Sequence, residues 1–245
     1  MRGEDGYGLR PNIGMRGAIS DRSKKVTLLE DGILLGPAPY SAPAAYYFPL
    51  LSRMTALEVF KGPAAIQHGP QTIGGAINLV SRPVPAMGHR LGVDMAAGTD
   101  AYGKWHGYYG YGTDRAGVMI EAVRLRSDGF KRLQVPAGVN DDTGFEKTEV
   151  VAKARVGSDP DAEVFHEGRV KLGFTYERSN ETYVGLSDVD FAAAPVNRYA
   201  ASQLDRMRNQ RLSLEAGYRM VIGKRFDLDV AFYRHHFTRS WFKLN

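Results

Sequence analysis

The sequence predicts a mainly β protein in which a small α+β domain precedes an antiparallel sheet of about seven strands. Two observations lead to this prediction. Residues 57–83 hold three glycine-rich turns between two short apolar segments, and glycine is the residue that most readily turns a chain sharply. From residue 89 onward, apolar and polar side chains alternate through one segment after another, as in strands with one apolar face. We therefore expect two domains, residues 1–88 and 89–245.

The composition sets limits on the class of protein. Of the 245 residues, 43% are hydrophobic, which is enough to build a core. The mean hydropathy is −0.32, and no stretch approaches the roughly 20 consecutive apolar residues of a membrane-spanning helix. This argues against a helical membrane protein but does not exclude a membrane barrel, whose strands carry an apolar residue only at alternate positions. Cysteine is absent, so a disulfide scaffold and a thiolate metal site are excluded.

The charge balance gives a weaker indication of partners. The net charge is +5 and the pI is about 9.3, values that by themselves are compatible with nucleic-acid binding. The basic residues, however, are interspersed with acidic ones and form no dense cluster. We therefore expect no nucleic-acid partner. The thirteen tyrosines suit the interfacial girdles of a membrane barrel and an ordinary β-sandwich alike.

The first domain is expected to contain a loop that displays aromatic side chains. Residues 26–29 are predicted to form a short strand that ends in a turn at Asp31 and Gly32. Residues 37–49 contain four prolines, which cannot donate to a strand ladder, so we predict a loop here. Loops carry binding residues more often than cores do. The alternative is that the tyrosines of this loop pack it onto its own domain. They are Tyr40, Tyr46 and Tyr47.

The second domain is predicted to be a ladder of long strands. We place them at about residues 90–98, 102–112, 116–126, 145–157, 164–178, 205–220 and 225–238. Their connections are mostly short at one end and long at the other, which is typical of outer-membrane barrels with the short turns on the periplasmic side. The alternation by itself leaves a soluble sandwich open.

Two places break the alternation. Glu121 shares a strand face with Val123 and Leu125, which predicts either a register shift or a β-bulge. In the last strand the pattern weakens beyond Phe232.

Several motifs resemble those of one family. EVFKGP (residues 58–63), HGP (68–70) and GGAINLVSR (74–82) are similar to the plug signature of TonB-dependent outer-membrane receptors. NIGMRG (12–17) and LLEDG (28–32) resemble the earlier plug motifs of the same family, in the same order. The resemblance implies a plug-like α+β domain followed by antiparallel transmembrane β-barrel strands, here an incomplete barrel.

Within the family, the sequence is most like receptors for ferric citrate, on the stretches 37–40, 44–49, 183–191 and 199–203. The resemblance implies import of a ferric chelate, ferric citrate or a related siderophore, across the Gram-negative outer membrane. It implies ligand binding by Tyr40, Tyr46, Tyr47 and Gln71 at the top of the plug. It also implies plug–barrel contacts by Arg16 and Lys61 with carboxylates of the barrel wall, although solvated surface charges remain the alternative.

We expect no enzymatic activity. The histidines are scattered, no nucleophile elbow is present, and no pair of carboxylates has surroundings suited to acid–base chemistry. No catalytic residue, metal site or cofactor is therefore predicted, apart from the ferric chelate as the transported ligand.

The expected partners follow from the resemblance. They are the ferric chelate, outer-membrane lipid, and the inner-membrane TonB complex acting through an N-terminal segment. That segment, a signal peptide and the first plug strands do not precede residue 12, so we expect this chain to be a fragment. Two alternatives remain open: a soluble β-sandwich that binds a ligand, and a receptor of the same family for a non-iron substrate.

Overall fold

The computed structural model describes residues 2–3, 9–36 and 47–243. The chain is mainly β, as predicted, and divides into two compact units, Met1–Arg82 and Pro83–Asn245. The sequence placed this division between residues 88 and 89, where the connection enters the first long strand. Tyr40 and Tyr46 lie outside the described residues.

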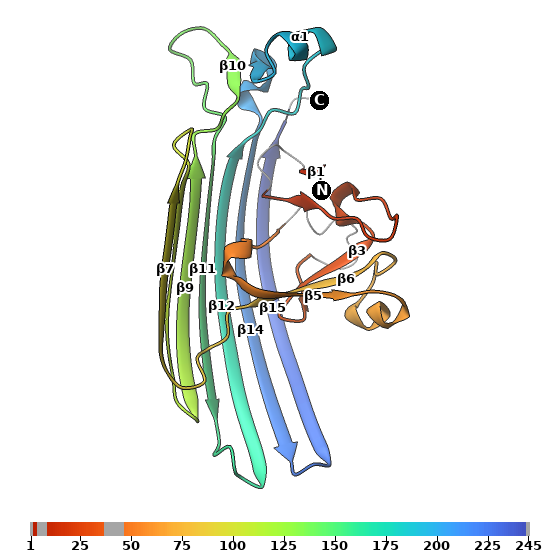
Figure 1. Cartoon of the computed structure of the whole chain (residues 1–245), viewed down its shortest axis with the longest axis vertical. Coiled ribbons are helices and arrows are strands. Elements are labelled where there is room, and N and C mark those ends of the chain that lie inside the picture. Colours follow the sequence, from red (N-terminus) through yellow and green to blue (C-terminus); the bar gives the residue numbers. More distant parts are fainter. Residues whose placement is uncertain (1, 4–8, 37–46, 244–245) are drawn as a thin grey trace. The chain divides into compact units, whose positions relative to one another are not determined.

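The first unit is built on a four-stranded sheet with the strand order β4-β3-β6-β5 (Figure 1). β3 (Val26–Glu30) lies parallel to β6 (Gly75–Ser81) and antiparallel to β4 (Ile33–Leu34). β5 (Met54–Phe60) pairs antiparallel with β6. The strands β1 (Arg2–Gly3) and β2 (Pro11–Asn12) form a separate two-stranded sheet.

The connection between β5 and β6 is the glycine-rich run identified in the sequence. A 3₁₀ segment, Pro63–His68, begins after Gly62 (φ 81°) and ends at Gly69 (φ 114°). Gly75 has φ 136°, and a Cβ there would lie 2.5 Å from the carbonyl oxygen of Phe60, so no other residue fits. The predicted strand–turn–strand unit is confirmed.

A small apolar cluster holds this unit together. Leu29, Ala65 and Ala76 are buried against one another, and Leu34 and Phe60 pack on them. The cluster joins β3, β6 and the 3₁₀ segment, so the glycine-rich connection is packed onto the sheet that it joins.

The second unit is one antiparallel sheet of seven strands, with the order β15-β14-β12-β11-β9-β8-β7. Apart from the short strands β10 and β13, which form a separate sheet, each strand pairs with the strands next to it in the chain, as Figure 1 shows. The number of strands is as predicted, and the strand ends lie within a few residues of the predicted ones. The strands are β7 (Gly88–Ala97), β8 (Gly103–Gly112), β9 (Ala116–Ser127), β11 (Phe145–Gly157), β12 (Val164–Asn180), β14 (Arg206–Ile222) and β15 (Phe226–Phe242).

The long connections lie at one end of this sheet and contain structure that the sequence did not predict. β10 (Arg132–Gln134) pairs in parallel with β13 (Asn197–Tyr199), so the two long loops are joined to each other. α1 (Asp188–Ala193) is a short helix in the second loop. In Figure 1, β10 and α1 lie at the end of the sheet opposite the turn that joins β14 and β15.

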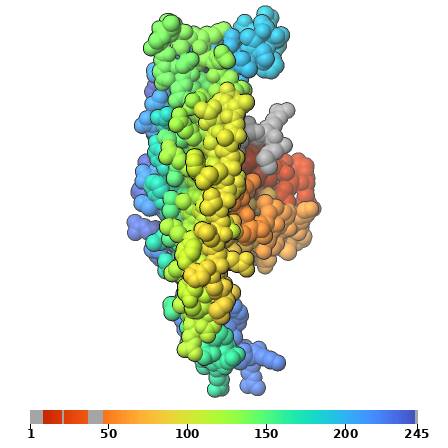
Figure 2. All heavy atoms as spheres, turned by 60° about the vertical axis from the view of Figure 1, so that its left-hand side comes forward, coloured from red at the N-terminus to blue at the C-terminus, as the bar shows by residue number. Residues whose placement is uncertain are grey.

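The two faces of the seven-stranded sheet differ in chemistry. On one face, large apolar side chains are exposed, among them Ile120 (52%), Leu172 (51%) and Leu212 (51%). Figure 2 views the unit from the side of β7, β8 and β9, drawn in yellow to green. Within the described residues of the second unit, 83–243, no second sheet packs on this apolar face. The dry two-layer interior of a β-sandwich is therefore not what these strands form.

The structure corrects the interpretation of Glu121. β9 keeps a continuous register with β8 and with β11, so neither the expected register shift nor a bulge is present. Glu121 lies on the polar face, where its Oε1 is 2.8 Å from Nε2 of His106. A polar partner on the adjacent strand accommodates the carboxylate, and this is why the alternation can break without a break in pairing. None of the helices in the described residues is long and apolar enough to cross a membrane.

Candidate functional site

The residues predicted to bind ligand are partly described. Tyr47 is 3% exposed, and its hydroxyl accepts a hydrogen bond from Nη2 of Arg53 at 3.2 Å. Gln71 is half-buried, with φ 70°, in the turn that follows Pro70. Thr27 anchors this turn, because its Oγ1 donates to the carbonyl oxygen of Pro70 at 2.5 Å.

The two predicted contact cations are both at the surface. Arg16, with φ 56°, and Lys61 are exposed. Among the described residues, neither of them forms an ion pair. Their role in contacts between plug and barrel stays a prediction.

Arg53 is a buried residue of the first unit that the sequence did not single out. Its Nη1 lies 3.1 Å from Oε1 of Glu30, and the two side chains are 1% and 4% exposed. Nη2 is 3.5 Å from the second carboxylate oxygen, which is the two-pronged geometry that guanidinium and carboxylate favour. Glu30 lies in the LLEDG motif, but its partner is 23 residues away, so the pair could not be found from local pattern.

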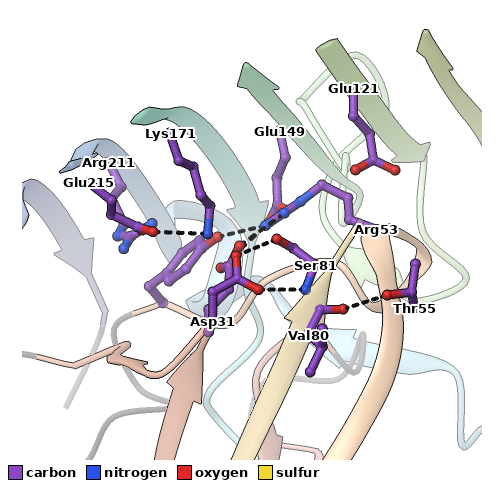
Figure 3. A network of polar contacts seen from close by, with 12 residues as sticks. Asp31, Arg53, Thr55, Val80, Ser81, Glu121, Glu149, Lys171, Arg211 and Glu215 are labelled. Carbon is purple, nitrogen blue, oxygen red and sulfur yellow. Dashed lines mark hydrogen bonds and ion pairs between the residues drawn. The ribbon is translucent and has the colours of Figure 1, made fainter. Parts of the chain in front are cut away.

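A second polar group ties the β3–β4 turn to the end of β6. The carboxylate of Asp31 accepts from the backbone N–H of Ser81 at 2.8 Å and from its hydroxyl at 2.5 Å (Figure 3). Asn78 accepts from the N–H of Gly32 at 2.9 Å and donates to Glu58 at 2.8 Å. These contacts link residues of three separate plug-like motifs, 28–32, 58–63 and 74–82, and explain why polar residues occur there.

The polar face of the second unit carries a row of ion pairs, which we call the polar wall: Lys147, Glu149, Lys171, Glu177, Arg211, Glu215 and His235. Nζ of Lys147 lies 3.1 Å from Glu177 and 3.7 Å from Glu149. All three side chains are at most 2% exposed. A buried cation between two carboxylates lowers the cost of burying these charges, because each carboxylate has the cation near it.

The wall continues across the next strands. Nζ of Lys171 is 3.3 Å from Oε2 of Glu215, a pair that Figure 3 marks with a dashed line. Nη2 of Arg211 is 3.0 Å from Nε2 of His235, and that nitrogen is 3.9 Å from Glu215. The wall is thus a set of fixed charges spread over four strands. Within the described ranges, no three His, Cys, Asp or Glu side chains are grouped as metal ligands.

The end of the sheet that carries the long loops holds an aromatic and cationic cluster. It consists of Tyr183 from a loop, Arg239 and Trp241 from β15, and Lys243, which follows β15. The indole N–H of Trp241 donates to the hydroxyl of Tyr183, and the ring centroids are 5.7 Å apart. The guanidinium of Arg239 lies 4.9 Å from the centre of the Trp241 ring, and Nζ of Lys243 lies 5.7 Å from it. Cations on aromatic faces are a stable arrangement. Tyr183 belongs to a stretch that carried the family likeness, whereas Trp241 was not identified from the sequence.

Three side chains order the loop around α1. The carboxylate of Asp190 accepts from the hydroxyl of Tyr199 at 2.5 Å and from that of Ser187 at 2.8 Å. Ser187 also caps the helix, because its Oγ accepts from the N–H of Asp190. The hydrogen bond from Tyr199, followed by that from Ser187, holds the pKa of Asp190 below its ordinary value of 3.8.

We expect this loop to lose stability as the pH falls below the ordinary carboxyl pKa of 3.8 and through the lowered pKa of Asp190. The pKa of Asp190 is lower in the folded chain, so its stabilising contribution is present above the ordinary carboxyl pKa and is lost as the pH falls through the lowered value. Hydrogen exchange at the amides of Asp190 and Phe191 should therefore lose protection at acid pH. Tyr199→Phe should reduce this pH dependence, whereas Tyr233→Phe, in β15, should leave it unchanged. An unaltered profile in Tyr199→Phe would contradict the assignment.

The fold and the polar wall define a class. A glycine-hinged four-stranded unit, followed by strands with one exposed apolar face and one charged face, is the arrangement of the plug and first barrel strands of TonB-dependent outer-membrane receptors. The chain resembles these receptors in its motifs and in its fold.

Comparison with solved structures shows which particular proteins have a fold similar to that of this chain. The ferric citrate transporter FecA in the unliganded form matches 98% of this chain with a TM-score of 0.78 and 22% identity. The ferric yersiniabactin uptake receptor FyuA of Yersinia pestis matches 97% with a TM-score of 0.73 and 20% identity. The siderophore receptor PiuA of Acinetobacter baumannii matches 97% with a TM-score of 0.63 and 14% identity. At these identities the matches show the fold.

A curated relative is similar in sequence. It is the vitamin B12 transporter BtuB of Photobacterium profundum, 26% identical over 155 residues, which are 60% of this chain and 24% of the relative. No family model matches the chain. The chain spans about a third of the length of the solved structures, since it covers 35% of the ferric citrate transporter and 37% of the yersiniabactin receptor.

Proposed function

We propose that the chain is the plug and first barrel strands of an outer-membrane receptor that imports a ferric chelate, ferric citrate or a related siderophore, in a TonB-dependent manner. The observation that carries the proposal is the sheet with reversed polarity: its apolar face is exposed and its charged face carries the polar wall. Such a sheet suits a lipid surface on one side and a wet lumen on the other.

The charges of the second unit support an anionic ligand. Arg239, Lys243, Trp241 and Tyr183 gather at the end of the sheet that holds the long loops, which are extracellular in barrels of this type. Cationic and hydroxyl donors attract and orient an anionic chelate. In the proposal, Tyr40, Tyr46, Tyr47 and Gln71 bind the chelate from the plug. Arg16 and Lys61 pair with carboxylates of the barrel wall.

The experiment is uptake of radiolabelled iron, or of radiolabelled cobalamin for that substrate, by cells with and without the coding sequence of this chain. Ferric citrate, a ferric hydroxamate and cobalamin are compared, each in cells with and without an active TonB complex. We expect TonB-dependent uptake of a ferric chelate that is lost with the coding sequence. Gln71→Ala should weaken chelate binding by about tenfold, the effect of losing one hydrogen bond to a charged ligand. Gln67→Ala, an exposed residue of the preceding 3₁₀ segment, is the matched control.

A second substrate is favoured by one specific observation. The curated relative described above is a vitamin B12 transporter, so cobalamin is the alternative ligand. Uptake of cobalamin without uptake of any ferric chelate would replace the iron proposal and leave the receptor class unchanged. If deletion of the coding sequence lowers the uptake of neither the ferric chelates nor cobalamin, the receptor function itself is contradicted.

A further inference from the structure

Four arginines gather on the apolar face of the seven-stranded sheet, at the end that carries the long loops. Arg124 and Arg126 lie on β9, Arg178 on β12 and Arg208 on β14. The registers place Arg126 opposite Glu146, Glu146 opposite Arg178, and Arg178 opposite Arg208. Three arginines and one glutamate therefore form a single row across four strands. We call the four arginines, together with Glu146 and Trp105, the basic rim.

The rim is incompletely neutralised. Arg178 and Arg208 are direct cross-strand neighbours, an arrangement that is unfavourable for like charges unless an anion lies near. Arg208 is exposed and forms no ion pair among the described residues. The other three each hold one carboxylate: Arg126 holds Asp128 at 3.0 Å, Arg124 holds Glu146 at 3.3 Å and Arg178 holds Asp142 at 3.4 Å.

These three contacts leave donors free. A guanidinium has five N–H donors, and the side chains of Arg124 and Arg126 are 56% and 61% exposed. The rim can therefore donate further hydrogen bonds to an anion without breaking its own ion pairs.

A hollow adjoins the rim on the same face. It has a volume of about 510 Å³ and is lined by Ala101, Gly103, Trp105, Arg124 and Arg126. Gly103 lies opposite Arg126 in the ladder. A Cβ at Gly103 would have only Nε1 of Trp105, at 3.8 Å, within contact range, so the missing side chain is what leaves this space open. Two guanidinium groups and an indole around a hollow suit a phosphorylated sugar.

A second hollow on the same face is apolar. It has a volume of about 330 Å³, and the alanines Ala152 and Ala154 form its floor between larger neighbours such as Ile120 and Leu172. Arg124 and Ile120 are four residues apart on β9, about 13 Å along a strand. An acyl chain attached to a headgroup at the rim spans this distance.

We propose that the basic rim binds the phosphorylated headgroup of an outer-leaflet glycolipid of the lipid A type, with an acyl chain in the apolar hollow. A lipid explains both hollows on one continuous face, whereas free phosphate would explain only the first. The inference rests on the proposed function, because it requires the apolar face to meet the membrane. The rim then lies at the extracellular edge, since the long loops are at that end.

The test uses the full chain inserted into vesicles of phosphatidylcholine alone or with radiolabelled lipid A. After extraction in mild detergent, the lipid A retained per chain is measured. Gly103→Leu fills the hollow at the rim. Gly107→Leu is its matched control, because Gly107 lies on the same face of the same strand and also has room for a Cβ, with the carbonyl oxygen of Gly92 at 3.9 Å. Arg178→Gln with Arg208→Gln removes two charges of the rim, and Lys224→Gln with Arg225→Gln removes two in the exposed turn between β14 and β15.

We expect the unaltered chain and both controls to retain lipid A, and the two rim variants to retain roughly tenfold less, a difference of about 1.4 kcal/mol. Equal retention by Gly103→Leu and Gly107→Leu would overturn the proposal, as would displacement of lipid A by inorganic phosphate. The proposed function is tested separately by insertion into vesicles of phosphatidylcholine alone. Normal insertion without retention of lipid A overturns only the proposal that the basic rim binds lipid A. Failure to insert overturns both this proposal and the proposed function.

Discussion

Replacing Lys147 by methionine is expected to destabilise the seven-stranded sheet by about 3–5 kcal/mol. Lys147 is fully buried between Glu149 and Glu177. Methionine has a similar length but no charge, so the substitution leaves two buried carboxylates without the cation between them. The measurement is the urea concentration at which the chain, inserted into phosphatidylcholine vesicles, loses protection from a short pulse of protease.

The matched control is Lys104→Met on β8. Lys104 pairs with Asp94 at 2.5 Å, but the aspartate side chain is 55% exposed, and such a pair contributes about 0–1 kcal/mol. Adding Glu177→Gln to Lys147→Met should recover part of the lost stability, because it removes one of the two opposed charges. If Lys147→Met and Lys104→Met cost the same, the polar wall is not a buried charge network.

Replacing Leu172 by arginine is expected to cost about 2–4 kcal/mol, the penalty for a cation on the lipid face near the middle of a membrane. Leu172 lies on the apolar face and is 51% exposed, opposite Ala152 and Leu214 in the ladder. In water, an exposed position of this kind tolerates arginine with a change within about 0.5 kcal/mol. The same protease measurement in vesicles therefore separates a face that meets lipid from one that meets water.

Thr148→Arg provides the reference for this substitution. Thr148 lies opposite Arg124 on one side and Tyr176 on the other, on the same face but closer to the basic rim. Near the membrane interface the penalty falls to about 0–1 kcal/mol. Equal and small effects at Leu172 and Thr148 would contradict the membrane orientation on which the proposed function and the basic rim both depend.

Much of the fold could be predicted because strand periodicity is local. The run Val170–Leu172–Phe174 alternates with Arg169, Lys171 and Thr175, and a period of two specifies an extended chain with one apolar face. Glycine at positions 62, 69 and 75 similarly indicated turns, and each has positive φ in the structure. These features are encoded within a few residues, so they can be recognised without knowledge of the tertiary structure.

The candidate site was predicted less completely, because its contacts join distant segments. Arg53 and Glu30, 23 residues apart, and His106 and Glu121, 15 residues apart, are charges whose partners local pattern cannot identify. The expected bulge at Glu121 was wrong for this reason: the partner histidine lies on the neighbouring strand. The pairing of β10 with β13 was missed because a three-residue strand has too few residues to show a period.

The sequence by itself determined where the chain turns, which segments are extended and which side chains share a strand face, since these depend on residues that are neighbours in the chain. Only the tertiary structure decided the strand order, the partners of the buried charges, and that the apolar face is the exposed one. The physical reason is that alternation fixes the difference between two faces but not which of them is covered. That choice depends on what packs against the sheet, and within the described residues of the second unit no packing partner covers the apolar face.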